Sequence, residues 1–175
     1  MIPKEDRDNL DDSGEEPAEE ESRTFLCVVD ESDELHQALR FASIRAKRTG
    51  GRVALLYVVE PAEYQHWMAV GNLMAEERRE EAEEMIQVVS SVVQRLSGSM
   101  PVIYIREGKL TDALMELIEN EKGISVLVLG ASTGTGSEGP GRLVSYVMKR
   151  IGKLPIPVTI VPGGLSDKEI DAISA

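Results

Sequence analysis

Short runs of apolar residues alternate along this chain with longer segments in which apolar residues recur every three or four positions. A run of four to seven apolar residues predicts a strand buried on both faces, whereas the wider spacing predicts an amphipathic helix. The predicted strands are residues 24–29, 53–59, 102–105, 124–129 and 156–161.

Segments with helical spacing separate these strands. Ser32 is placed to cap the first helix, and Gly50 and Gly51 to end it. The second helix is long, about 72–96, and follows an irregular segment at 61–71. The residues expected to face inward are Leu35, Leu39, Ala42 and Ala46 on the first helix, Met85, Val89, Val92 and Leu96 on the second, Leu110, Leu114, Leu117 and Ile118 on the third, and Leu143, Val147 and Ile151 on the fourth.

Strands that alternate with helices predict an α/β fold, a doubly wound parallel sheet of five strands with helices on both faces. Pro157 cannot donate a backbone hydrogen bond, so the fifth strand is expected at a sheet edge. Ser166 and Glu169 match a capping box that would open a short C-terminal helix.

Acidic residues are distributed unevenly along the chain. Residues 1–22 hold ten acidic and two basic residues and very few apolar ones. Such a segment cannot bury enough surface to offset the entropy of ordering it, so we expect a disordered acidic tail. A folded domain at 23–163 and a C-terminal helical extension at 164–175 complete the expected organisation.

The formal net charge of −12 argues against nucleic acid or an anionic membrane surface as a partner. No stretch approaches the roughly 20 apolar residues of a membrane span. The single cysteine, Cys27, has apolar neighbours and is expected in the core. One unpaired thiol fits a protein of the reducing cytoplasm.

The candidate chemistry lies at two strand ends, because ligands of doubly wound sheets bind beyond the carboxyl ends of the strands. Asp30 follows the first strand, and five glycines occur among the twelve residues 130–141 that follow the fourth. Glycines permit close backbone approach, and exposed N–H groups favour an anion. Ser145 and Arg142 add a hydroxyl and a cation. This loop is therefore either a phosphate site or a plain flexible connection.

Other known chemical motifs are either misplaced in this sequence or missing from it. Residues 134–139 formally match the dinucleotide fingerprint, but that motif belongs after the first strand. The chain has neither a Walker pattern nor the lysine that a receiver domain requires. Two isolated histidines and one cysteine do not make a metal site. We therefore expect no catalytic and no metal-ligating residues.

The order of several short motifs resembles the universal stress protein family over residues 23–163. The matching stretches are 28–32 (VVDES), 55–59 (LLYVV), 106–108 (REG) and 126–130 (VLVLG) through 155–161 (PIPVTIV). The resemblance implies the strand order 3-2-1-4-5. It also implies a homodimer through the edge strand 156–161, and an unpaired strand edge favours such pairing independently.

Members of this family that bind ATP, with Mg²⁺ as an accompanying ion, suggest which positions to examine. By resemblance, Asp30 and the Val58 backbone would hold the nucleoside. The phosphates would lie against Gly130, Ser132, Gly134 and Ser145. The sequence departs from the family's glycine motif at Ala131 and Val144, where a Cβ would hinder close phosphate approach.

Two functional hypotheses follow. The first is a cytoplasmic, dimeric stress-response protein that binds ATP or another adenine nucleotide, acting as a regulator and at most a slow ATPase. The second is a module of the same family that binds no nucleotide and contacts an unidentified protein partner. Asp30 and the glycines favour the first hypothesis, whereas Ala131 and Val144 favour the second.

Overall fold

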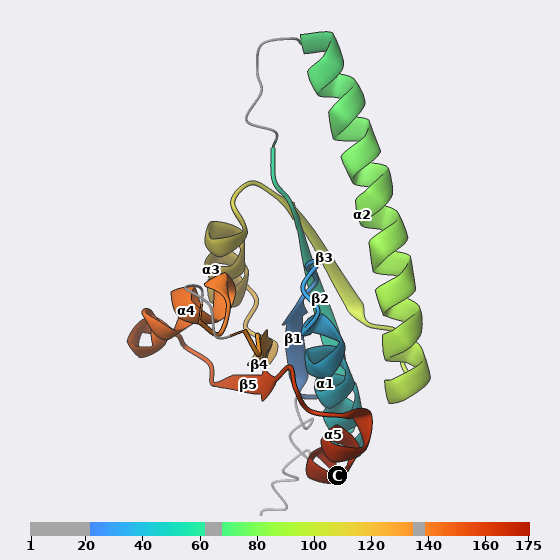
Figure 1. The fold of residues 1–175 in the computed structure, drawn as a ribbon, viewed down its shortest axis with the longest axis vertical. Coiled ribbons are helices and arrows are strands. Elements are labelled where there is room, and N and C mark those ends of the chain that lie inside the picture. Colours follow the sequence, from blue (N-terminus) through green and yellow to red (C-terminus); the bar gives the residue numbers. More distant parts are fainter. Residues whose placement is uncertain (1–21, 62–67, 135–138) are drawn as a thin grey trace, which may run out of the picture.

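Five parallel strands form one sheet (Figure 1). The structure is a computed structural model and describes residues 22–61, 68–134 and 139–175, so nearly all of the predicted acidic tail lies outside the described residues. The sheet order is β3-β2-β1-β4-β5, which confirms the predicted order 3-2-1-4-5 and the edge position of the last strand. The strands are β1 (Thr24–Val28), β2 (Arg52–Val59), β3 (Val102–Glu107), β4 (Ile124–Ala131) and β5 (Val158–Pro162).

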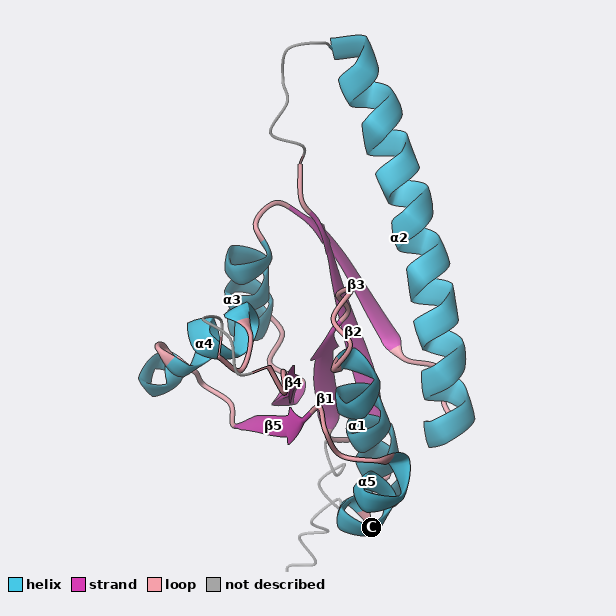
Figure 2. Cartoon of the chain, in the orientation of Figure 1, coloured by secondary structure: helices cyan, strands magenta, loops and turns pink. Residues whose placement is uncertain are grey.

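Helices cover both faces of the sheet, as predicted (Figure 2). Helices α1, α2 and α5 pack on one face, and α3 and α4 pack on the other. Their bounds are α1 (Leu35–Thr49), α2 (Met68–Ser97), α3 (Leu110–Asn120), α4 (Arg142–Met148) and α5 (Asp167–Ser174), and a 3₁₀ turn, η1 (Ile151–Lys153), follows α4.

The central strand β1 is buried along its whole length because both of its faces are covered. Cys27 faces the side of α1 and α2, and Leu26 and Val28 face the side of α3 and α4. Burial raises the pKa of the Cys27 thiol to about 12, so it stays protonated and packs as a small apolar group. Its predicted place in the core is confirmed.

Sequence signals for helix ends hold at two positions and fail at a third. Gly50 closes α1 in the left-handed conformation, at φ 66°. The capping box of Ser166 and Glu169 is present at the start of α5. The prediction of Ser32 as the cap of α1 was wrong: Glu34 stands at that position without a side-chain cap. The Ser32 hydroxyl instead donates to the Asp30 carboxylate at 2.6 Å.

Three differences from the predicted elements concern α2, α4 and β5. Helix α2 begins at Met68, inside the expected irregular segment, because one glycine at position 71 costs a helix only about 1 kcal/mol. Helix α4 ends at Met148, and Ile151 starts the 3₁₀ turn with 45% of its surface exposed instead of facing the core. Strand β5 begins at Val158 because Pro157 has no N–H for the ladder and offers only its carbonyl, to Leu127.

Candidate functional site: a cleft at the ends of β1 and β4

A cleft of about 750 Å³ opens beyond the carboxyl ends of β1 and β4. Strands β2 and β4 flank β1 on opposite sides. The chain leaves β1 toward β2 and leaves β4 toward β5, so the segments that follow β1 and β4 diverge. The start of α1, the start of α3 and residues 139–141 before α4 form the walls.

The floor of the cleft is apolar. Val28 and Val128 contribute from the central strands, Leu35 and Ala38 from α1, and Val144 from α4. Ala38 and Val144 are buried, so this floor is continuous with the packed core on both faces of the sheet. A flat apolar ring can lie on such a surface, while polar groups on the rim fix its orientation.

Asp30 shapes the β1 side of the rim. Its Oδ1 accepts hydrogen bonds from the backbone N–H of Ser32 at 3.1 Å and from the Ser32 hydroxyl at 2.6 Å. This local turn leads the chain from β1 to α1 and keeps the carboxylate at the mouth of the cleft.

The glycine-rich loop folds back on itself at the β4 side. The Ser132 N–H donates to the Pro140 carbonyl at 2.9 Å, and the Gly134 N–H donates to the Ser132 hydroxyl oxygen at 3.1 Å. Gly141 has φ 110°, a conformation that L residues rarely adopt, so glycine is required where the loop turns into α4.

Gly130 has a packing role that its sequence context did not reveal. A Cβ at this position would lie 2.7 Å from the Glu34 Cβ and closer still to the Glu34 carbonyl oxygen. Gly163, just after β5, is similar, because its Cβ would lie 2.7 Å from the Glu34 Cγ. The two glycines therefore let the start of α1 approach the ends of β4 and β5.

Carboxylates outnumber cations around the cleft. Glu60, at the end of β2, accepts a hydrogen bond from the Leu110 N–H at 3.1 Å and so satisfies a donor at the start of α3. The cationic side chains among the described lining residues are Lys109 and Arg142, and the acidic ones are Asp30, Glu31, Asp33, Glu34 and Glu60.

The structure brings three of the six predicted site residues to this cleft, namely Asp30, Gly130 and Ser132. Val58, Gly134 and Ser145 are not among its described lining residues. Val58 pairs with Arg106 of β3, and Ser145 lies on α4, where its N–H donates to the Gly141 carbonyl.

Sequence reasoning missed Glu34, Glu60 and Lys109 as lining residues. Glu60 follows β2 as Asp30 follows β1, so the strand-end rule could have found it. Lys109 caps α3 with its backbone only, and Glu34 precedes α1, so neither position carries a distinctive signal.

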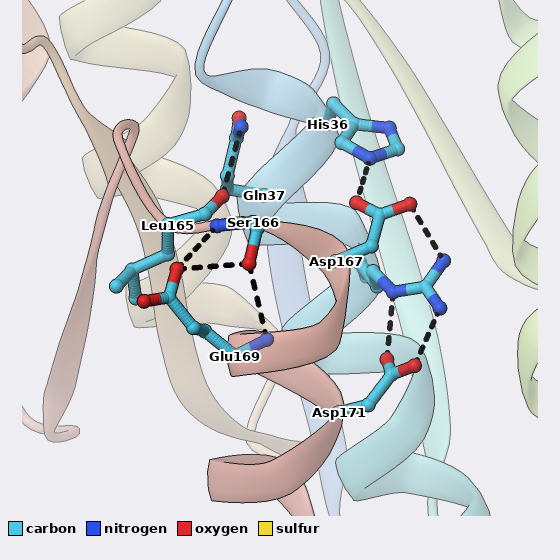
Figure 3. Close-up of polar contacts among 8 residues, drawn as sticks. His36, Gln37, Leu165, Ser166, Asp167, Glu169 and Asp171 are labelled. Carbon is cyan, nitrogen blue, oxygen red and sulfur yellow. Dashed lines mark hydrogen bonds and ion pairs between the residues drawn. The ribbon is translucent and has the colours of Figure 1, made fainter.

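Ion pairs and hydrogen bonds join the C-terminal helix α5 to α1 (Figure 3). Arg40 of α1 makes two 2.7 Å hydrogen bonds to the Asp171 carboxylate and an ion pair of 3.3 Å with Asp167. His36 Nε2 lies 2.6 Å from the other Asp167 oxygen. The hydrogen bond from Arg40 lowers the pKa of Asp171 below its ordinary value.

The described residues hold neither a metal-ligand cluster nor a membrane-spanning helix. Over 22–61, 68–134 and 139–175, no three His, Cys, Asp or Glu side chains lie together as metal ligands would. None of the helices in these ranges is long and apolar enough to cross a membrane.

Comparison with known proteins gives a consistent picture. Residues 21–162 match the family model of the universal stress proteins. Among solved structures, universal stress protein UspA from Lactobacillus plantarum is 26% identical, with a TM-score of 0.65, over 79% of this chain and 97% of that one. No curated protein sequence matches.

Two more distant structures are described with ligands. The universal stress protein from Archaeoglobus fulgidus in complex with dAMP is 19% identical, with a TM-score of 0.55, over 80% of this chain and 97% of that one. A universal stress protein in complex with cAMP is 18% identical, with a TM-score of 0.61, over 81% and 98% of the two chains. At these identities the likeness concerns the fold.

Proposed function

The chain belongs to the universal stress protein family, and on that premise we propose that it binds an adenine nucleotide in the cleft beyond β1 and β4. In this proposal the protein acts as a nucleotide-dependent regulator and at most as a slow ATPase. A reducing cytoplasm suits the buried, unpaired thiol of Cys27.

The cleft itself is the observation that carries this proposal. Its apolar floor offers a surface for a purine, and Asp30 stands on the rim, where it could accept hydrogen bonds from ribose hydroxyls. Ser132 and the backbone near Gly130 would face the phosphate end. The dAMP and cAMP complexes of proteins with this fold make adenine nucleotides the first ligands to test.

Nucleotide binding is tested by calorimetry with AMP and ATP, together with identification of any nucleotide that co-purifies. Asp30→Ala should weaken binding roughly ten- to a hundredfold, the loss expected for hydrogen bonds to a charged group. Glu119→Ala removes an exposed carboxylate of α3 that does not line the cleft, and should leave binding unchanged. No retained nucleotide and no heat from the wild-type protein would contradict the proposal.

The internal hydrogen bonds of the loop favour the second hypothesis, a module without nucleotide. The N–H groups of Ser132 and Gly134 already donate within the loop. If calorimetry shows no binding, the second hypothesis applies, and the protein would act by contacting a partner protein.

We also propose a homodimer that forms through the edge strand β5. In the described sheet β5 pairs with β4 alone, so its outer row of backbone groups can pair with a second copy. Ile160 presents an apolar side chain at this edge with 37% of its surface exposed. Two copies related by a twofold axis could bury both Ile160 side chains.

A charge at the edge should separate the two copies. Ile160→Glu would place a carboxylate in the paired edge, and light scattering should then give the mass of a monomer. Ile173→Glu, on the exposed side of α5, is the matched control and should keep the wild-type mass. A dimer that withstands Ile160→Glu would rule out the β5 interface.

A further inference from the structure

We propose that the cleft selects an adenine nucleoside monophosphate over the triphosphate, an inference that rests on the proposed nucleotide site. It concerns the number of phosphates, and so it can fail while adenine binding itself holds.

Charge is the first reason. Five carboxylates and two cations line the described part of the cleft, a formal excess of three negative charges. Each further phosphate adds about one negative charge to the ligand. Charges that share a cleft with low-dielectric walls act on one another more strongly than charges in open water. A triphosphate therefore meets a growing repulsion that a monophosphate largely avoids.

The second reason is that donors on the described β4 side of the cleft are already engaged. The Ser132 N–H donates to the Pro140 carbonyl, and the N–H of Gly134, which is not a described lining residue, donates to the Ser132 hydroxyl oxygen. A phosphate that bound either N–H would first have to displace its present acceptor. One phosphate needs fewer such donors.

A donor at the start of α3 is engaged in the same way. Glu60 accepts from the Leu110 N–H at 3.1 Å, so this donor is already paired. An anion that bound at the start of α3 would first have to displace the Glu60 carboxylate.

A divalent ion that arrived with the triphosphate would offset part of the charge of the phosphates. The experiment therefore has a separate arm with Mg²⁺.

The test is calorimetry of the full-length protein with adenosine, AMP, ADP and ATP, in EDTA and then in excess Mg²⁺. In EDTA, AMP should bind at least roughly tenfold more tightly than ATP, with ADP between them. The double variant Glu31→Gln, Asp33→Asn should narrow this gap by raising ATP affinity more than AMP affinity. The double variant Glu116→Gln, Glu119→Gln is the matched control, because it also removes two exposed charges, from α3 outside the cleft lining, and should leave the gap unchanged.

The outcomes separate the two proposals. ATP binding as tightly as AMP in EDTA, or more tightly once Mg²⁺ is present, would overturn the selectivity and leave adenine binding intact. A gap that the double variant does not change would also overturn it, because charge would then not be the cause. Failure of all four compounds to bind would overturn the proposed nucleotide site, and the selectivity with it.

Discussion

Replacing Gly130 with alanine should lower the free energy of unfolding by about 2–3 kcal/mol, the usual cost of overpacking a tight site. The added Cβ would lie 2.7 Å from the Glu34 Cβ and 2.8 Å from its carbonyl carbon. Backbone cannot rotate away as the end of a flexible side chain can. The start of α1 must shift, so ligand binding should weaken together with stability. Guanidinium unfolding and calorimetry measure the two effects.

Gly123→Ala is the control for this substitution. Gly123 stands just before the same strand, has no atom within 4 Å of the place that an added methyl group would take, and does not adopt positive φ. Alanine there should be neutral or stabilising by up to about 1 kcal/mol. Equal stabilities of the two variants would show that the contact between Gly130 and α1 is not tight.

Ile170→Ala should destabilise the docking of α5 by about 3 kcal/mol, within the range for cavities left by large apolar residues. The Ile170 side chain is fully buried and belongs to the same core cluster as Leu39 and Val161. Because α5 is a short terminal helix, part of the loss should appear as local opening. Hydrogen exchange of the α5 amides, read beside guanidinium unfolding, separates local from global loss.

Ile173 supplies the comparison on the same helix. It is 60% exposed, so Ile173→Ala should change stability by no more than about 0.5 kcal/mol. If both variants behaved alike, α5 would be held mainly by the ion pairs of Arg40 with Asp167 and Asp171. Burial of Ile170 would then not be what fastens the helix.

The fold could be predicted from the sequence because its strongest signals are local and periodic. Strand β1 is buried on both faces and therefore appears as an unbroken apolar run. The buried stripe of α2 was harder. Val89 is buried and Met85 packs against the core as predicted, whereas Val92 is only partly buried. Ala82, Ile86 and Val93 are also buried and were not predicted. Ala82 is small, and a search for large apolar side chains passes over it.

The cleft could be predicted only in part. Asp30 and Gly130 follow from the strand-end rule, which depends on topology alone, whereas Ser132 was named through the family resemblance. The contact of Gly130 with Glu34 joins residues almost a hundred positions apart and depends on the helix approach, which no local pattern encodes. The sequence alone therefore does not distinguish a glycine that allows a helix to approach from one that allows a phosphate to approach.

The position of Glu34 has a consequence for communication across the molecule. Glu34 lies close to Gly130, at the end of β4, and to Gly163, directly after the edge strand β5. An occupant that displaced the beginning of α1 would press on the end of the strand along which two copies would meet. In the proposed nucleotide-bound dimer, Glu34 would therefore connect the cleft with the edge strand, and any effect of the ligand on pairing would be matched by an equal effect of pairing on ligand affinity.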